Sequence, residues 1–204
     1  MRTALNPTPV VAGLLVVALV LVAGACAADP AGAGDPAPSA GEVEPSTSAA
    51  EPAVLELSSP DLDGDGRLPE WATATVMSFC AGENRSPRLE WTGVPEGVES
   101  FALTLVDATE PEFVHWVVTG IDAETRAVES TPAGTISEGV VGWNFLSPGA
   151  YRGPCVEDHT YTFTLYALGI ELVGSAHTTR EDLLGWIEGH VLASASLDVR
   201  RAAG

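Results

Sequence analysis

The sequence predicts a mostly β protein, a sandwich or barrel of antiparallel strands with one helix late in the chain. Three observations support this. Apolar residues alternate with a period of two through much of the second half, glycine and proline separate these stretches, and only one stretch has helical spacing. The chain has 204 residues, of which 46% are hydrophobic, so it can build one domain with a proper core.

Strands are expected at residues 75–79, 100–107, 114–118, 159–168 and 194–200. In SFALTLVD, apolar side chains stand at the odd positions from Phe101 to Leu105, and in HTYTFTLYAL from Tyr161 to Leu165. The run VHWVV is apolar on both parities except at its histidine, which is typical of a strand buried on both faces. These patterns place alternate residues of each strand in the core.

One helix is predicted near the C-terminus. Thr178 and Glu181 have the spacing of a capping box, which marks a helix start. A helical stripe of apolar residues follows, made of Leu183, Leu184, Ile187 and Val191. The strand expected at 194–200 comes after this helix.

The N-terminal region predicts export. Residues 10–25 form an uncharged run of 16 Val, Leu, Ala and Gly residues, short for a membrane span and suited to a signal peptide. Ala23-Gly24-Ala25 then precede Cys26, and this pattern resembles a bacterial lipoprotein box. We expect residues 1–25 to be a signal peptide and Cys26 to be lipidated, with plain secretion as the alternative.

Residues 26–53 are expected to be a disordered tether, and residues 54–204 the folded domain. The tether has no aromatic residue and consists mainly of Ala, Pro, Gly, Ser and acids, so it cannot bury enough apolar area to fold. The formal net charge is −19, or −20 once the signal peptide with its one arginine is removed. A chain this acidic repels nucleic acid and anionic lipid alike, so membrane attachment is expected through lipid at Cys26.

The cysteine count agrees with export. The chain has three cysteines, and lipidation of Cys26 would leave Cys80 and Cys155 for a disulfide in an oxidising compartment. Two free buried cysteines are the alternative.

The acidic stretch that begins at Asp61 resembles a calcium loop, since Asp63, Asp65 and Gly66 follow at the right spacing. Such a loop needs a glutamate at its twelfth position, which is Ala72 here, and no helix is predicted on either side. We therefore expect an Asp-Gly turn, with weak structural calcium binding as a minor alternative.

Three ionisable residues are expected on core-facing positions. Asp107, His115 and His159 come from separate predicted strands, and a buried carboxylate is costly unless it is paired, for example with an imidazole. Each could be a separately satisfied interior group, but together they favour a shared polar pocket. The nearby Gly153-Pro154 fixes a backbone that can present N–H or carbonyl groups to a ligand.

No motif indicates catalysis. The sequence contains no G-x-S-x-G nucleophile motif, and its histidines and cysteines lack close metal-ligand spacing. Metal ligation by these histidines with Cys80 or Cys155 is the less favoured alternative. We expect no enzyme, no metal site and no cofactor.

An ordered series of short motifs gives a resemblance to a known family. The motifs are NRSPRLEWTGVPEGVESFALTLVD, FVHWVV, GAYRGPC, HTYTFTLYAL and TREDLLGWIEGHVLASASL. Together they resemble the phosphatidylethanolamine-binding protein family, in particular its bacterial Raf-kinase-inhibitor-like branch, over nearly all of residues 56–200. The resemblance implies a Greek-key β-sandwich with few helices and a small anion pocket at one end.

The resemblance also implies ligand-binding residues. Asp107 matches the first acid of the family's Asp-Pro-Asp-Ala-Pro, and His115 matches the histidine of the next strand. The family's Gly-Pro loop and His-Arg-Tyr are matched by Gly153, Pro154, His159 and Tyr161. Two departures stand out: the second acid is Thr109, and the arginine after the histidine is Thr160.

The function expected from these observations is non-catalytic binding of a small anionic or phosphorylated ligand, such as a phosphoethanolamine headgroup. The alternative is an interaction module that inhibits or regulates an extracellular enzyme. In either case the expected location is the outer face of a bacterial cell membrane, with secretion as the alternative, and no nucleic acid is expected as a partner.

Overall fold

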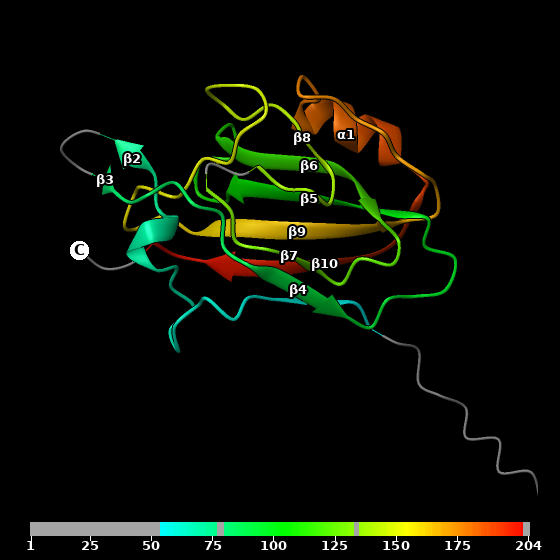
Figure 1. Ribbon diagram of the computed structural model, residues 1–204, viewed down its shortest axis with the longest axis horizontal. Helices are drawn as coiled ribbons and strands as arrows, with labels where there is room; N and C mark the ends of the chain where they lie inside the picture. The colour runs from blue at the N-terminus through cyan, green and yellow to red at the C-terminus, as the bar shows by residue number, and fades with distance from the viewer. Residues whose placement is uncertain (1–53, 77–79, 133–134, 202–204) are drawn as a thin grey trace, which may run out of the picture. The chain divides into compact units, whose positions relative to one another are not determined.

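The computed structural model describes residues 54–76, 80–132 and 135–201, which form a β-sandwich with one α-helix (Figure 1). The strands are β1 (Glu56–Ser58), β2 (Thr75–Val76), β3 (Cys80–Ala81), β4 (Leu89–Thr92), β5 (Ser100–Asp107), β6 (Val114–Asp122), β7 (Ala127–Val128), β8 (Val140–Val141), β9 (Tyr161–Leu168) and β10 (Val191–Val199). The helices are a short 3-10 turn, η1 (Glu70–Ala72), and α1 (Arg180–Ile187).

The strands form two main antiparallel sheets. One has the order β10-β9-β5-β6-β8 and the other β1-β4-β7, while β2 and β3 pair separately. Strand β9 returns to lie beside β5, so the order β9-β5-β6-β8 is that of a Greek key. The prediction of an antiparallel sandwich with a late helix and a final strand is therefore confirmed.

The main core lies between the two sheets. Leu57, Leu89 and Trp91 of the smaller sheet meet the odd-numbered residues of β5 and β9, which are fully buried. The rings of Trp91 and Phe101 pack with centroids 5.3 Å apart. These are the apolar residues whose alternation predicted the strands, so the period of two correctly identified the inner face.

Strand β5 is buried on its other face as well. Ala102 packs with Val117 and with Leu183 and Ile187 of α1, in a second apolar cluster outside the large sheet. Small residues at the even positions of β5 leave room for this helix, which lies at the end of the sandwich away from β2 and β3 (Figure 1). The helix thus adds a third layer that the alternation alone did not predict.

Two details of the predicted helix are wrong. The capping box is made by Thr179 and Asp182, whose side chains each accept the backbone N–H of the other; the Thr178 hydroxyl instead accepts Ser175 N–H at 2.8 Å. The helix also ends at Ile187, so Val191 lies in a strand rather than on the helical stripe.

The helix ends where glycine permits a left-handed turn. Gly189 has φ = 78°, a conformation that glycine adopts without strain. The chain can then reverse, and Val191 begins β10 by pairing with Leu168 of β9. As a result β10 is longer than the strand expected at 194–200.

Some predictions fall outside the described residues. These are the signal peptide, Cys26 and the tether within residues 1–53, and positions 77–79 of the first expected strand. In the part of the chain that is described, no helix is long and apolar enough to cross a membrane.

Candidate functional site

The end of β5 brings a carboxylate and an imidazole together. Asp107, the last residue of β5, pairs in register with Tyr161, the first residue of β9, so the segment before Tyr161 can reach it. Asp107 Oδ2 lies 2.6 Å from His159 Nδ1. The side chain of Asp107 is only 3% exposed and that of His159 16% exposed. The pair therefore lies at the boundary between core and solvent.

The other carboxylate oxygen of Asp107 also has partners. Oδ1 accepts the backbone N–H groups of Thr109 at 2.9 Å and Glu110 at 3.0 Å. Three hydrogen bonds supply the partners that a buried charge requires. Because the backbone of Thr109 makes its bond, a threonine in place of an acid keeps this contact.

His115 of β6 lies close by and is held by the loop that follows Tyr151. Its Nδ1 is 2.8 Å from the carbonyl oxygen of Arg152, which can only accept, so Nδ1 carries the proton. The His115 ring packs edge-on against Tyr161 at 5.1 Å, and the His159 ring lies 6.3 Å from the same tyrosine. Both imidazoles therefore flank one aromatic ring, each with its Nδ1 hydrogen-bonded to the protein.

The surroundings shift the pKa values of the two imidazoles in opposite directions. The hydrogen bond to Asp107 raises the pKa of His159 above its ordinary value, and nearby carboxylates add to this effect. Burial lowers the pKa of His115, with the Arg152 carbonyl opposing the shift. His159 therefore keeps its positive charge to a higher pH than His115 does.

The Gly153-Pro154 loop is fixed by its own backbone groups. Gly153 N–H donates to Asn84 Oδ1 at 2.9 Å, and the Pro154 carbonyl accepts Ala74 N–H at 3.2 Å. We expected this loop to present backbone groups to a ligand, but these two groups already have protein partners. Both contacts hold the loop whose Arg152 carbonyl lies against His115, and ligand binding by Gly153 and Pro154 stays a prediction.

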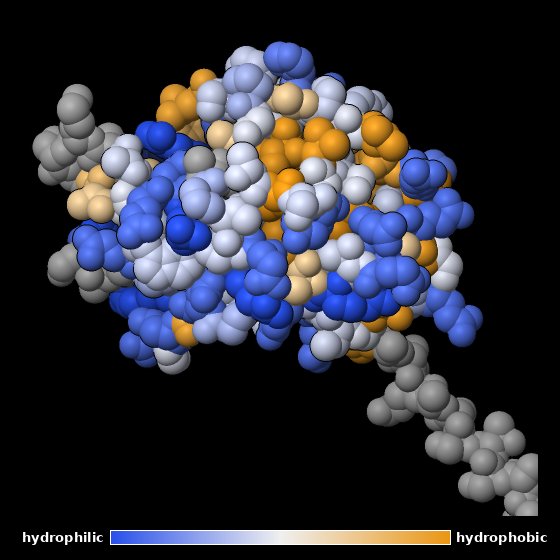
Figure 2. Space-filling model, in the orientation of Figure 1, coloured by the Kyte–Doolittle hydropathy of each residue, from blue (hydrophilic) through white to orange (hydrophobic). Residues whose placement is uncertain are grey.

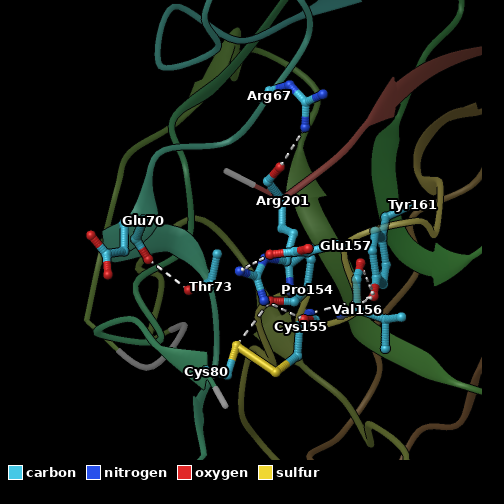
Figure 3. Close-up of polar contacts among 10 residues, drawn as sticks. All are labelled: Arg67, Glu70, Thr73, Cys80, Pro154, Cys155, Val156, Glu157, Tyr161 and Arg201. Carbon is cyan, nitrogen blue, oxygen red and sulfur yellow. Dashed lines mark hydrogen bonds and ion pairs between the residues drawn. A yellow bond between two sulfur atoms is a disulfide. The ribbon is translucent and has the colours of Figure 1, made fainter. Parts of the chain in front are cut away.

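Tyr161 and a disulfide hold the next part of this loop (Figure 3). The Tyr161 hydroxyl accepts the N–H groups of Cys155 at 3.4 Å and Val156 at 3.0 Å. Cys155 is joined to Cys80 in a disulfide, with Cα atoms 5.8 Å apart. The Cys155 carbonyl accepts Arg201 Nη1 at 2.8 Å. The structure thus contains the disulfide expected for an oxidising compartment.

Gly153→Ala is expected to destabilise the domain by about 1–3 kcal/mol, because an added Cβ would overpack the loop. That Cβ would lie closer than 3.0 Å to backbone atoms of Ala72, Thr73 and Ala74, which cannot move like a flexible side chain. Urea unfolding measures the change. Gly64→Ala is the control because its Cβ would meet nothing within 4 Å. Equal stability of both variants would contradict the expected crowding.

Two surface hollows adjoin the sandwich without including the histidine pair. One, of about 430 Å³, is lined by Arg67, Glu157, Asp158, Thr160 and Arg200. The other, of about 390 Å³, is lined by Glu99, Ser100, Gly120, Ile121, Asp122, Glu171, Leu172 and Val173. The first borders the loop that carries His159, while the second lies at the opposite ends of β5 and β6.

Comparison with known protein families shows which family has this fold and sequence. The family described as "Phosphatidylethanolamine-binding protein" matches residues 58–202, which is most of the chain. The chain belongs to this family. Its relatives include a UPF0098 protein of Methanothermobacter thermautotrophicus, 40% identical over 139 residues, which cover 65% of this chain and 88% of the relative. The Escherichia coli UPF0098 protein YbhB is 31% identical, over 70% of this chain and 97% of its own.

Solved structures of the phosphatidylethanolamine-binding protein family have the same fold. E. coli YbcL, described as a new member of the mammalian family, superposes with a TM-score of 0.66 at 24% identity and covers 74% of this chain and all of its own. A homologue from Chlamydia trachomatis gives a TM-score of 0.64 at 25% identity, over 74% and 99% of the two chains.

Within this family member, sequence reasoning missed several supporting residues. Asn84 has a positive φ of 54°, and its amide bridges Gly153 N–H and the Tyr151 carbonyl. Phe145 packs against both His115 and Phe113, at 5.1 and 5.2 Å. No local signal in the sequence indicates the contact of Asn84 with a loop 69 residues away.

The acidic stretch near Asp61 forms turns in this family member. Asp61 Oδ2 accepts Arg88 N–H at 2.7 Å, and Asp63 Oδ1 accepts the N–H groups of Asp65 and Arg67 at 3.0 and 2.8 Å. Asp63 thus binds the backbone of its own turn, as the Asp-Gly turn interpretation expected, while Asp61 binds the backbone just before β4. Among the residues that the structure describes, no cluster of three His, Cys, Asp or Glu could hold a metal ion.

Proposed function

We propose that this domain binds a small phosphorylated or otherwise anionic ligand, such as a phosphoethanolamine headgroup, and catalyses no reaction on it. One observation carries the proposal: Asp107 engages His159 through Nδ1 and favours its cationic form. Its Nε2–H is then the group left to donate a charge-assisted hydrogen bond to a phosphate oxygen. Membership of the phosphatidylethanolamine-binding protein family supports the same assignment.

His115 supplies the complementary interaction. Because its Nδ1 proton is donated to the Arg152 carbonyl, neutral His115 has a lone pair on Nε2. That nitrogen would accept a hydrogen bond from an ammonium group or a protonated phosphate oxygen. A donor ring beside an acceptor ring suits a zwitterion such as phosphoethanolamine, while Asp107 orients His159 rather than contacting the ligand.

Calorimetric titration with phosphoethanolamine tests this function, using protein purified from cells that express the full-length chain. We expect His159→Gln to weaken binding at least about tenfold, the loss of one charge-assisted bond of about 1.5 kcal/mol. His190→Gln is the matched control, since His190 is exposed beyond α1. Binding that survives His159→Gln unchanged would refute the proposed role of His159.

Binding should weaken as the pH rises. Asp107 raises the pKa of His159, so its positive charge is complete at low pH and is lost as the pH passes through the raised value. We expect affinity to fall about tenfold between pH 6 and pH 9, because a charge-assisted hydrogen bond becomes a neutral one. Above about pH 6 the phosphate monoester is mostly dianionic and its own titration adds little. A pH-independent affinity in wild type would contradict the charge assignment.

A second function, regulation of an extracellular enzyme, is favoured by exposed apolar side chains near the site. Trp143 and Leu146 are 39% and 56% exposed, on the segment that carries Phe145 beside His115. Figure 2 shows hydrophobic residues gathered on the face it presents, mainly toward the side where α1 lies. If this function holds, Trp143→Ser would abolish inhibition of the partner enzyme and His159→Gln would not.

We also propose export with a lipid anchor at Cys26, in line with the signal-peptide pattern and a disulfide suited to an oxidising compartment. Cells expressing the full-length chain should incorporate labelled palmitate into it. Cys26→Ser should lose the label and release the protein into the medium. A label retained by Cys26→Ser would contradict acylation at this residue.

A further inference from the structure

We propose a second ligand site, specific for a small dianionic oxyanion such as phosphate, in the 430 Å³ hollow beside the His159 loop. Two of the residues that line it, Arg67 and Arg200, would form an anion clamp. This site is separate from the histidine pair and does not depend on the function proposed for that pair.

The backbone forces these two arginines together. Arg67 and Arg200 lie directly opposite each other in a parallel bridge, fixed by hydrogen bonds from Arg200 N–H to Gly66 O at 3.1 Å and from Leu68 N–H to Arg200 O at 2.8 Å. Opposed residues of neighbouring strands point to the same face, and both side chains do line the same hollow. Like charges in this position destabilise a strand pair unless a counter-ion lies between them.

No carboxylate of the described residues forms an ion pair with either arginine. Glu157, which also lines the hollow, is engaged by Arg201 at 2.8 Å (Figure 3). Within the described segments, the Arg67 guanidinium donates to the Arg201 carbonyl oxygen alone, at 3.4 Å. Although Glu157 and Asp158 line the same hollow, neither forms an ion pair with Arg67 or Arg200, so the two facing arginines keep an unmet need for an anion.

The remaining lining residues define the ligand. The guanidinium group presents paired N–H donors that match the oxygens of phosphate, and the Thr160 hydroxyl adds a further donor. Asp158 also lines the hollow and would repel an extended polyanion. A compact oxyanion held between the two arginines is the chemistry that satisfies both conditions.

Thermal unfolding in inorganic phosphate tests the clamp, in a His159→Gln background that disables the proposed histidine site. The Tm of protein purified from cells that express the full-length chain is compared in about 20 mM phosphate and in sodium chloride of equal ionic strength. A dissociation constant of about 1 mM predicts that phosphate raises Tm by about 4–7 °C. Adding Arg67→Gln or Arg200→Gln should remove most of that rise. Arg126→Gln should keep it, because Arg126 lies in an exposed turn and binds only local carbonyls.

A second readout comes from the repulsion itself. In chloride without phosphate, Arg200→Gln should unfold at a Tm equal to or about 1–2 °C above its parent, since it removes an opposed like charge. In phosphate the parent should instead have the higher Tm of the two proteins. The proposal is overturned if phosphate fails to raise the Tm of the parent, or if both arginine variants keep the full rise. Failure of the histidine site would leave these arginine-dependent shifts unchanged, so the two proposals are tested separately.

Discussion

Asp107→Asn is expected to weaken phosphoethanolamine binding by about 100-fold. The asparagine amide would place a donor against His159 Nδ1, where a carboxylate oxygen now accepts at 2.6 Å. His159 would lose the interaction that favours its charged form and would have to change its protonated nitrogen. Loss of a charged ligand contact and of its orientation together account for roughly 3 kcal/mol.

Calorimetry at neutral pH measures this effect. Asp122→Asn is the matched control, since Asp122 ends β6 at the other end of the sandwich, where its side chain accepts Glu124 N–H. The Asp107→Asn protein should also bind with little dependence on pH, a change that simple loss of stability would not cause. Affinity within a factor of two of wild type would show that Asp107 does not organise the site.

Removal of the disulfide should have the largest effect on stability. The bond between Cys80 and Cys155 closes a loop of 75 residues, and the loop-entropy relation gives about 4 kcal/mol for a closure of this size. The double variant Cys80→Ala/Cys155→Ala should therefore unfold roughly 10 °C lower than wild type. Reducing agent should lower the Tm of wild type by a similar amount and leave the variant unchanged.

The same variant should bind ligand more weakly while still folded. Cys155 N–H and Val156 N–H meet the Tyr161 hydroxyl, and Arg152 in the same loop holds His115. Freeing the loop loosens both contacts, so affinity measured well below the Tm should fall. A free energy of unfolding within 1 kcal/mol of wild type would contradict the entropic estimate.

The long strands were predictable because their pattern is local. Phe101, Leu103 and Leu105 alternate with small residues, and the same period governs β9. The short strands β1, β4, β7 and β8 were missed, since two to four residues carry no clear period and are defined by the strands they pair with. The third layer was missed because the small residues Ala102 and Thr104 do not form an apolar face in the sequence. In the structure α1 nevertheless packs over that side of β5.

The residues of the candidate site were predictable, but their hydrogen-bond partners were not. Strand parity placed Asp107 and His159 on the core-facing side, although β9 begins only at Tyr161, and His115 stood out inside an apolar run. The structure brings these side chains around Tyr161. Which nitrogen each ring uses depends on the Arg152 carbonyl and on the register of β5 with β9. Neither of these long-range contacts leaves a pattern in the local sequence.

Ligand binding at the histidine pair is tested most directly by an NMR titration with phosphoethanolamine that follows the ring signals of all four histidines. Saturable shifts are expected at His115 and His159, with His177 and His190 as internal controls that stay unchanged. Nε2 rather than Nδ1 of His159 should respond, since Nδ1 is held by Asp107. Unchanged His115 and His159 signals at millimolar ligand would contradict phosphate binding at this site.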